Sequence, residues 1–192
     1  MQIERITNPS DLTQFDDRVA ELTGVRHTVN YYKDCDVFAC YDTNKKMIGG
    51  YAFKLKPPFR ALWALSHQPH AYIKFFQDTT LAQIVEQSAL WIELESMLMR
   101  DKAIFFQSLM KYVLQCDRDY MLYAYNSSKA HLQKLYSRME PDILFEGELF
   151  GEGRDPYPVS INAVDLAALK PLAEAAYFMT YSSEAALEAK TN

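Results

Sequence analysis

The sequence lacks the features that mark membrane-spanning, nucleic-acid-binding and disulfide-rich proteins. It has no run of about 18 apolar residues, and Met1–Asn8 shows neither the basic start nor the apolar core of a signal peptide. The net charge is −5 at pH 7, whereas phosphate binding requires clustered Lys and Arg. The three cysteines include no C-x-x-C pair, which favours reduced thiols. We therefore expect a cytoplasmic protein with no membrane span and no nucleic-acid partner.

Several motifs of catalysis and cofactor binding are also missing. There is no G-x-S-x-G sequence, no Walker loop and no glycine fingerprint for dinucleotides. His67 and His70 have a spacing that could chelate a metal, but Pro69 lies between them and no cysteine or carboxylate is close in sequence. The sequence therefore predicts no metal site.

Aromatic residues, in contrast, are abundant, with 13 Tyr and 11 Phe among 192 residues. A chain of this length suits one domain and can bury a sizeable core. The aromatic excess indicates a large core together with a groove or a subunit contact lined by rings. It is compatible with a homodimer.

The spacing of apolar residues predicts an α/β (α+β) fold, a mixed sheet with helices on both faces. The predicted strands are Met1–Thr7, Asp36–Tyr41, Met47–Leu55, Ala89–Met99, Tyr120–Tyr125, Ile143–Phe150 and Val159–Val164. The predicted helices are Asp11–Leu22, Lys102–Gln115, Asn126–Met139 and a region from Asp165, with shorter helical pieces in Phe59–Gln77 and Thr80–Ser88. Ser10, Asp101 and Asn126 are the predicted N-caps. Gly49 and Gly50 indicate a bulge or the close approach of another backbone.

The segment Asn126–Met139 carries a family resemblance. Asn126, Ala130, Leu135 and Tyr136 stand close to the places of N-x-x-x-A-x-x-L-Y, with a one-residue slip before the leucine. This motif resembles the closing segment of the Gcn5-related N-acetyltransferase (GNAT) superfamily, although the glycine and phenylalanine that usually follow are missing. The order of elements is similar over residues 1–165, and residues 166–192 are predicted to form a C-terminal helical extension of the same domain. The resemblance implies a GNAT-like, mostly antiparallel central sheet.

The resemblance also implies a site for a thioester donor, either acyl-CoA or an acyl carrier protein. In GNAT enzymes the pantetheine arm lies between the strands that correspond to Ala89–Met99 and Tyr120–Tyr125. The pyrophosphate rests on backbone amides at the start of the next helix, whose signature is Q/R-x-x-G-x-G/A. Ala103 and Phe105 replace the small residues of that signature, so a capped helix with nothing bound is the alternative. The residues expected to hold the donor are Met97, Leu98, Met99, Arg100, Lys102, Ala103 and Asn126.

Three side chains are expected to carry the chemistry. Glu93 and Glu95 are predicted to share one face of the central strand, where two carboxylates would raise each other's pKa and suit a general base. An exposed strand face or an ion pair is the alternative. Tyr136 falls where the family often has a tyrosine that protonates the leaving thiolate, although its spacing fits a core aromatic equally. Asn126 contacts the cofactor or caps the helix.

Two functions follow from these features. The first is an N-acyltransferase that moves an acyl group from the thioester to an amine of a small molecule or peptide by direct attack. Trp91 with Glu93 and the aromatic stretch Pro57–Phe76 are faintly similar to acyl-homoserine-lactone and N-acyl amino acid synthases. The second is a catalytically inactive binding or regulatory protein that has lost the pyrophosphate loop. An open cleft between the central strands favours the first, and exposed glutamates or a pocket filled by Phe105 favour the second.

Overall fold

The computed structural model describes residues 1–24, 26–65, 73–93, 95, 97–149 and 157–171. Within them, seven strands form one sheet in the order β1-β2-β3-β4-β5-β7-β6. The strands are β1 Gln2–Ile6, β2 Cys35–Tyr41, β3 Met47–Lys54, β4 Ile84–Ile92, β5 Tyr120–Asn126, β6 Asp142–Leu149 and β7 Tyr157–Asp165. Neighbouring strands are antiparallel except β4 and β5, which are parallel. The predicted fold class, a mixed and mostly antiparallel sheet, is confirmed.

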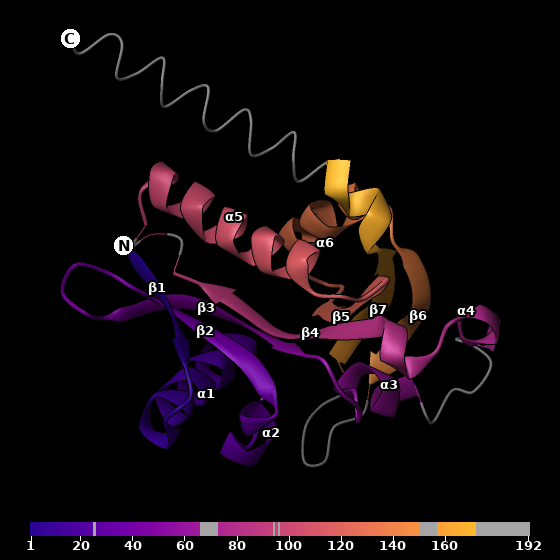
Figure 1. Cartoon of the computed structure of the whole chain (residues 1–192), viewed down its shortest axis with the longest axis horizontal. Coiled ribbons are helices and arrows are strands. Elements are labelled where there is room, and N and C mark those ends of the chain that lie inside the picture. Colours follow the sequence, from indigo (N-terminus) through magenta and orange to yellow (C-terminus); the bar gives the residue numbers. More distant parts are fainter. Residues whose placement is uncertain (25, 66–72, 94, 96, 150–156, 172–192) are drawn as a thin grey trace, which may run out of the picture.

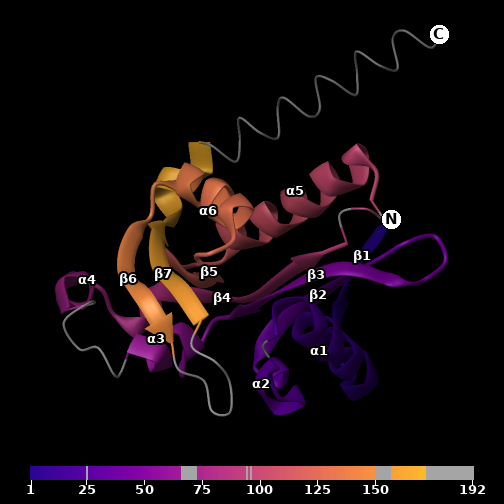
Figure 2. The same ribbon diagram turned by 180° about the vertical axis from the view of Figure 1, so that it is seen from behind.

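Helices cover both faces of the sheet (Figures 1 and 2). One face carries the long helix α5 and the short α6, and the other carries α1, α2 and α3. The helices are α1 Pro9–Thr23, α2 Val29–Lys33, α3 Arg60–Leu65, α4 Ile73–Asp78, α5 Met99–Gln115 and α6 Ala130–Tyr136, with single 3-10 turns at Leu81–Gln83 (η1) and Ser137–Met139 (η3). Among the described residues, no helix is long and apolar enough to cross a membrane.

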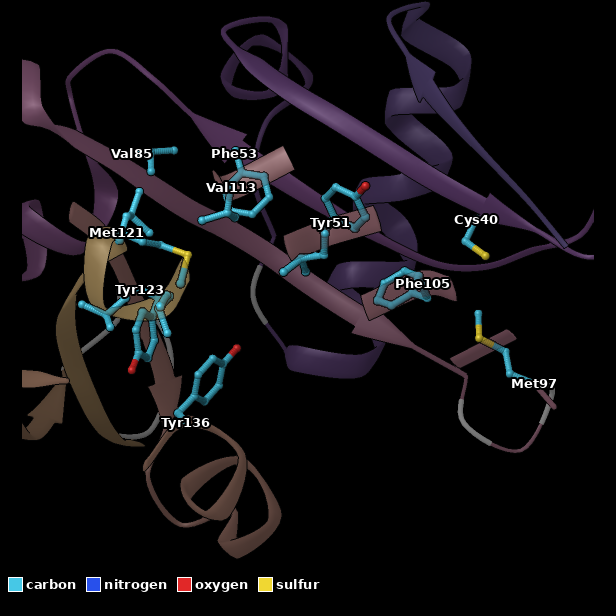
Figure 3. Close-up of a cluster of buried hydrophobic side chains, with 14 of the residues drawn as sticks. Cys40, Tyr51, Phe53, Val85, Met97, Phe105, Val113, Met121, Tyr123 and Tyr136 are labelled. Atoms are coloured by element: carbon cyan, nitrogen blue, oxygen red, sulfur yellow. The ribbon is translucent and has the colours of Figure 1, made fainter. Parts of the chain in front are cut away.

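The two faces of the sheet have different cores. Under α5 and α6 the core is rich in aromatic rings, and Figure 3 shows Tyr51, Phe105, Tyr123 and Tyr136 among them. Under α1 and α2 the core contains Leu12, Phe15, Val19, Tyr32, Val37, Ala52 and Trp91. Each helix buries the apolar stripe that its sequence provides, which is why both layers form against a single sheet.

Gly50 explains how α1 comes so close to the sheet. A Cβ atom added there would lie 2.5 Å from Cε2 of Phe15 in α1 and 2.6 Å from the Phe38 carbonyl oxygen of β2. Only a residue without a side chain fits between that ring and that strand. The expected close approach of another backbone is confirmed.

The predicted N-caps of three helices are corrected by the structure. At α6 the N-cap residue is Lys129, without a side-chain cap, so Asn126 does not cap that helix. At α1 the cap is Asn8, whose Oδ1 accepts a hydrogen bond of 2.9 Å from the Asp11 amide, rather than Ser10. At α5 the helix begins before Asp101, because Leu98 has an extended backbone and its carbonyl accepts from the Lys102 amide at 3.0 Å. Asp101 therefore lies in the first turn of α5 instead of capping it.

The central strand also differs from the prediction. Residues Thr80–Ser88 were expected to be helical and Ala89–Met99 to be the strand, but β4 runs from Ile84 to Ile92. The last residue pair between the two strands is Ile92 with Gly49 of β3, and one further hydrogen bond of 2.8 Å joins the Glu93 amide to the Ile48 carbonyl. The polar side chains of residues 86–88 hide the start of the strand in the sequence.

Candidate functional site

The sheet opens between β4 and β5. The two strands pair only from Ile84 to Gln87 of β4 and from Tyr120 to Tyr123 of β5. Beyond these pairs β4 continues beside β3, and β5 continues beside β7. We call the region between residues 88–92 of β4 and residues 124–126 of β5 the strand opening. Backbone groups on its two edges have no strand partner among the described residues, so they are available to an extended ligand.

A β-bulge lies where the strands part. Phe53 of β3 is opposite Gln87, but Ala52 is opposite Ala89, so Ser88 is an extra residue on β4. A bulge bends its strand and increases the local twist. The bulge at Ser88 therefore gives a physical reason for β4 to turn away from β5 at this point, and Ser88 is the first residue of the opening.

On the α6 face, Tyr136 lies at the apex of the opening. Its hydroxyl accepts a hydrogen bond of 3.0 Å from Nε2 of Gln87, the last β4 residue that pairs with β5. Its ring stacks on Tyr123 and Tyr125 at centroid distances of 4.6 and 5.0 Å. Burial raises the pKa of Tyr136 to about 12. The hydroxyl is therefore protonated at neutral pH and able to donate a proton.

On the opposite face, Glu86 of β4 is a buried carboxylate, 2% exposed. Its Oε1 accepts from the Ala61 amide at 2.6 Å, and its Oε2 accepts from the Arg60 amide and the Tyr31 hydroxyl, each at 3.0 Å. The two amides belong to the first turn of α3, so Glu86 caps that helix from the sheet. Glu86 was not among the predicted site residues, because the sequence around it predicted a helix instead of the strand β4. The β-branched pair Ile84-Val85 was the available signal.

Tyr31 connects Glu86 to the bulge. Its hydroxyl lies 2.8 Å from Oγ of Ser88 as well as 3.0 Å from Glu86. Burial, followed by the charge of Glu86, raises the pKa of Tyr31 above its ordinary value. The ammonium group of Lys54, a residue only 3% exposed, lies 4.4 Å from the centroid of the Tyr31 ring, and Lys54 is opposite Glu86 in the sheet. Buried charges of both signs therefore meet around one phenol.

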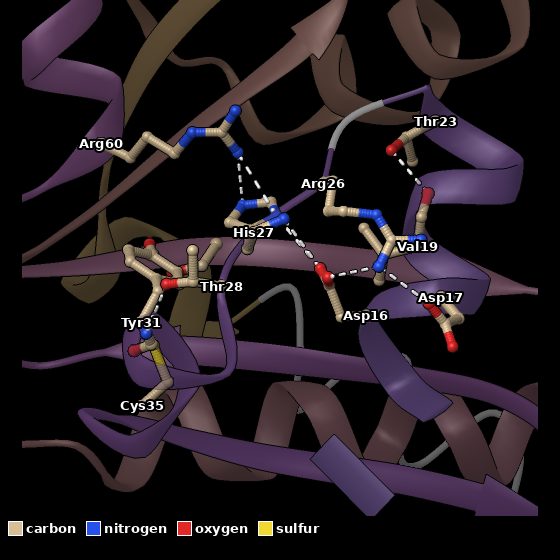
Figure 4. Close-up of polar contacts among 11 residues, drawn as sticks. Asp16, Asp17, Val19, Thr23, Arg26, His27, Thr28, Tyr31, Cys35 and Arg60 are labelled. Atoms are coloured by element: carbon tan, nitrogen blue, oxygen red, sulfur yellow. Dashed lines mark hydrogen bonds and ion pairs between the residues drawn. The ribbon is translucent and has the colours of Figure 1, made fainter. Parts of the chain in front are cut away.

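A second polar group fixes the segment that precedes α2 (Figure 4). The guanidinium of Arg60 is hydrogen-bonded to Nε2 of His27, and the His27 amide donates to Oδ1 of Asp16 at 2.8 Å. Burial, followed by the nearby charge of Arg60, lowers the pKa of His27 to about 3. His27 is therefore a neutral ring that joins α1 to α3. His67 and His70 lie outside the described residues.

Glu93 and Glu95 do not share a strand face, because β4 ends before either of them. Glu93 forms ion pairs with Arg18 and with Lys46, whose Nζ lies 2.8 Å from its Oε2, while Glu95 is exposed. The prediction that the two carboxylates would share one face of the strand is wrong. Their role as a general base stays a prediction.

The residues predicted to hold the donor gather at the start of α5, with the exception of Asn126. Met97 is buried and packs with Phe105 over Gly49 of β3, on the other side of β4 from the opening. In Figure 3, Phe105 and Met97 lie on the far side of β4 from Tyr123 and Tyr136. Asn126, at the end of β5, uses its Oδ1 to accept from the Ser128 amide at 2.9 Å.

The start of α5 is exposed and lacks a side-chain cap. Leu98 and Met99 are 73% and 79% exposed, and no side chain caps the helix at Leu98. The first helical bond reaches the Lys102 amide, so the amides before it point out of the helix end. Arg100, Lys102 and Ala103 follow in the first two turns. These amides attract anions, whereas Asp101 in the same turn opposes them.

Solved structures with a similar fold are acyltransferases. NAA60 of Arabidopsis thaliana, in complex with a bisubstrate analogue, matches with a TM-score of 0.61 and 13% identity over 85% of this chain and 97% of that chain. The N-acyl amino acid synthase FeeM from uncultured soil microbes matches with a TM-score of 0.62 and 12% identity over 87% of this chain and 96% of that chain. An N-acetyltransferase from Staphylococcus aureus Mu50 matches with a TM-score of 0.55 and 15% identity over 86% of this chain and 97% of that chain. No family model and no curated protein sequence matches the chain.

Proposed function

Because this chain has the GNAT fold in a divergent form, we propose that it is an N-acyltransferase that moves an acyl group from a thioester donor to an amine. The observation that carries the proposal is the strand opening that begins at the Ser88 bulge. A parallel strand pair that ends after four residues leaves two backbone edges facing each other. An extended pantetheine arm offers amide groups that hydrogen-bond to such edges as an added strand would.

The donor would lie with its acyl thioester at the apex of the opening. Structures of Arabidopsis thaliana NAA60 hold acetyl-CoA or a bisubstrate analogue, and we extend an acyl-CoA or acyl-carrier-protein donor to this chain. The phosphates of such a donor would meet the uncapped amides at the start of α5, with Arg100 and Lys102 nearby. The bulge amides at Ser88 and Ala89 would support the charge that develops on the thioester oxygen.

Direct attack by the amine requires a proton acceptor on one side and a proton donor on the other. We assign the role of proton donor to Tyr136. Its protonated hydroxyl lies beside Gln87 at the apex and would protonate the departing thiolate. Of the three carboxylates considered, Glu86 lies nearest in sequence to the bulge, while Glu93 is held by Arg18 and Lys46 and Glu95 lies beyond the strand. We therefore assign the base function to Glu86 ahead of the other two.

The first experiment measures thermal unfolding of the purified chain with CoA, acetyl-CoA and a long-chain acyl-CoA. A ligand at about 100 times its dissociation constant adds ~2.7 kcal/mol to the free energy of unfolding. A shift with acetyl-CoA supports an acetyl donor, and a shift with the long chain alone supports a long acyl donor. Release of free thiol in the presence of an amine panel then tests transfer itself.

A pair of charge variants separates binding at α5 from general effects. Met99→Glu places a carboxylate at the exposed start of α5, and Leu22→Glu places one at the exposed end of α1. We expect Met99→Glu to weaken CoA binding by about tenfold through repulsion of the phosphates, and Leu22→Glu to leave binding unchanged. Equal binding by both variants would mean that the α5 terminus does not contact the donor.

A binding or regulatory protein that has lost the pyrophosphate loop is the second candidate. It is favoured by one observation, the exposure of Leu98 and Met99 together with the carboxylate of Asp101 at the helix start. This candidate predicts no thermal shift with any of the three CoA ligands and no thiol release with any amine.

A further inference from the structure

Three side-chain oxygens form a continuous line from the strand opening into the core. Ser88 Oγ lies 2.8 Å from the Tyr31 hydroxyl, which lies 3.0 Å from Oε2 of Glu86. Ser88 is half-buried at the bulge, and Glu86 is 2% exposed. The line therefore joins the first residue of the opening to a carboxylate that the protein itself surrounds.

The bulge accounts for the position of Ser88 in this line. Side chains alternate along a strand, so Glu86 and Ser88 point to the same face, while Gln87 points to Tyr136 on the other face. The extra residue then brings Ala89 to the Glu86 face as well, where it joins the core under α1 with Trp91. Without the bulge, the serine would lie within a regular ladder instead of at the edge of the opening.

The arrangement of protons along the line has a direction. A phenol carries one proton, so Tyr31 can donate to only one of its two neighbours at a time, and a bond to a carboxylate is stronger than one to a hydroxyl. Tyr31 therefore donates to Glu86, and the rotating hydroxyl of Ser88 donates to the Tyr31 oxygen. The free lone pairs of Ser88 are left as the end of the line that can receive a proton.

Neighbouring groups hold the line in place without competing for the proton. The amides of Arg60 and Ala61 fix the carboxylate of Glu86, and Lys54 provides the opposite charge in the same buried region. The Cys35 thiol lies within hydrogen-bond reach of Ser88, and burial raises the pKa of Cys35 to about 12, so it stays protonated. Cys35 therefore does not act as an alternative base.

We propose that Ser88, Tyr31 and Glu86 relay the amine proton out of the reaction centre, an inference that rests on the proposed acyl transfer. The amine nitrogen forms its bond to the thioester carbon, and the carbon–sulfur bond breaks. The departing thiolate takes the proton of Tyr136 and leaves as a thiol, and Tyr136 regains a proton from water. The proton on nitrogen passes to Ser88 Oγ as the serine proton passes to Tyr31 and the tyrosine proton passes to Glu86. Glu86 ends protonated and returns its proton to water by the reverse path after the amide leaves.

The test compares two neighbouring tyrosines. Tyr31→Phe removes the middle oxygen of the line and keeps the ring. Tyr32→Phe is the matched control, because Tyr32 is 1% exposed and its hydroxyl has no partner among the described residues. We expect Tyr31→Phe to lower kcat for acyl transfer about 100-fold with unchanged donor binding in the thermal-shift assay, and Tyr32→Phe to keep the wild-type rate.

A solvent isotope measurement separates a relay from a merely structural role. In mixtures of H2O and D2O, the wild-type rate should depend on deuterium content with curvature, because several protons move together. Ser88→Ala should give a slower reaction with a linear dependence, since amine and buffer then exchange a single proton. A wild type that releases no thiol with any amine overturns the proposed function and the relay with it. A wild type that is active, with Tyr31→Phe equally active, overturns the relay alone.

Discussion

The two faces of β4 at the strand opening stabilise their polar groups in different ways. On the α6 face, the Tyr136 hydroxyl lies among stacked rings and accepts one hydrogen bond, from the Gln87 side-chain amide, within the described part of the chain. On the α2 and α3 face, the Glu86 carboxylate is bound by two helix amides and a phenol. The comparison shows that two different polar groups lie against one strand. The Tyr136 hydroxyl of α6 is shielded by aromatic rings on one face, and the Glu86 carboxylate of β4 is bound by hydrogen-bond donors on the other.

The largest effect on stability is expected from removing the Glu86 carboxylate. Glu86→Ala leaves the amides of Arg60 and Ala61 and the Tyr31 hydroxyl buried without their partner. An unsatisfied buried polar group costs about 1–3 kcal/mol, so the free energy of unfolding should fall by at least ~3 kcal/mol. Urea denaturation measures it, with Glu146→Ala on the exposed face of β6 as control, expected within ~0.5 kcal/mol of wild type. A loss below ~1 kcal/mol for Glu86→Ala would contradict the capping role.

Two adjacent glycines compare the packing of the faces. Gly50→Ala places a Cβ 2.5 Å from the Phe15 ring and 2.6 Å from the Phe38 carbonyl, which is backbone and cannot yield. We expect a loss of ~2–3 kcal/mol in denaturant unfolding. Gly49→Ala on the other face places its Cβ 3.2 Å from Cε of Met97 and 3.3 Å from both the Phe105 ring and the Trp91 carbonyl. All three contacts are longer than the two shortest at Gly50, so the loss should be smaller, about 1 kcal/mol. Equal losses would show that the α1 face is no tighter than the α5 face.

The buried histidine makes stability depend on pH on the α2 side. The pKa of His27 is about 3 in the folded protein and 6.5 when unfolded, so below pH 6.5 the unfolded chain takes up a proton that the folded chain does not. Stability is therefore lost as pH falls from 6.5 toward 3, by up to about 1.4 kcal/mol per pH unit. Denaturation from pH 7 to 4 checks this against His27→Gln, which should lose less. Asp16 is present in both proteins, so its own titration cancels when the two are compared. If the free energies of unfolding of the wild type and His27→Gln fell in parallel with pH, the assignment of this pH dependence to His27 would be contradicted.

Removing the Tyr136 hydroxyl should have a smaller effect on stability. Tyr136→Phe keeps the ring stack and breaks one hydrogen bond to Gln87, for an expected loss of about 1 kcal/mol in the free energy of unfolding. If Tyr136 protonates the thiolate, kcat should fall by at least tenfold, because general acid catalysis contributes about 100-fold or more. Tyr32→Phe, which removes a buried hydroxyl without a partner among the described residues, is the control and should retain activity.

The smallest effect is expected at the start of α5. Asp101→Asn removes an acidic side chain from the first turn, which costs about 0.5 kcal/mol through the helix dipole. The same change removes a negative charge near any bound phosphate, so CoA affinity should rise about twofold. Titration calorimetry and thermal unfolding measure the two quantities on the same protein. A drop in stability with no gain in affinity would place the phosphates elsewhere.

The sequence predicted the α6 face of the site better than the α2 face. Tyr136 was proposed from the resemblance of Asn126–Met139 to the GNAT closing segment. The helical spacing of Leu132, Tyr136 and Met139 equally predicted a core position, and the three residues do pack in one core. That pattern also placed Leu135 on the buried face, but Leu135 is 40% exposed, since α6 is only seven residues long and turns into η3. Seven strands and the fold class followed from similar local patterns.

The α2 face escaped prediction for a physical reason. Glu86 and Ser88 are polar residues inside a strand, and their hydrogen-bond partners lie 25 to 57 positions away in the sequence. No local pattern indicates that a polar side chain is satisfied at such a distance. Tyr31 lies in a five-residue helix without a recognisable period. The boundary error at β4 followed from the same polar residues, and it left Glu93 and Glu95 as the only carboxylates that the sequence predicted on the central strand.

The short pairing of β4 with β5 also has a consequence for how the chain folds. Strands β1 to β4 form one antiparallel meander of sequence neighbours, and β5, β7 and β6 form a second antiparallel unit. Only four residue pairs join the units, and the whole of α5 separates those strands in the sequence. Local antiparallel pairing forms faster than distant parallel pairing. We therefore expect the two half-sheets to fold first and their junction last, so the slowest refolding step should be the one that creates the opening.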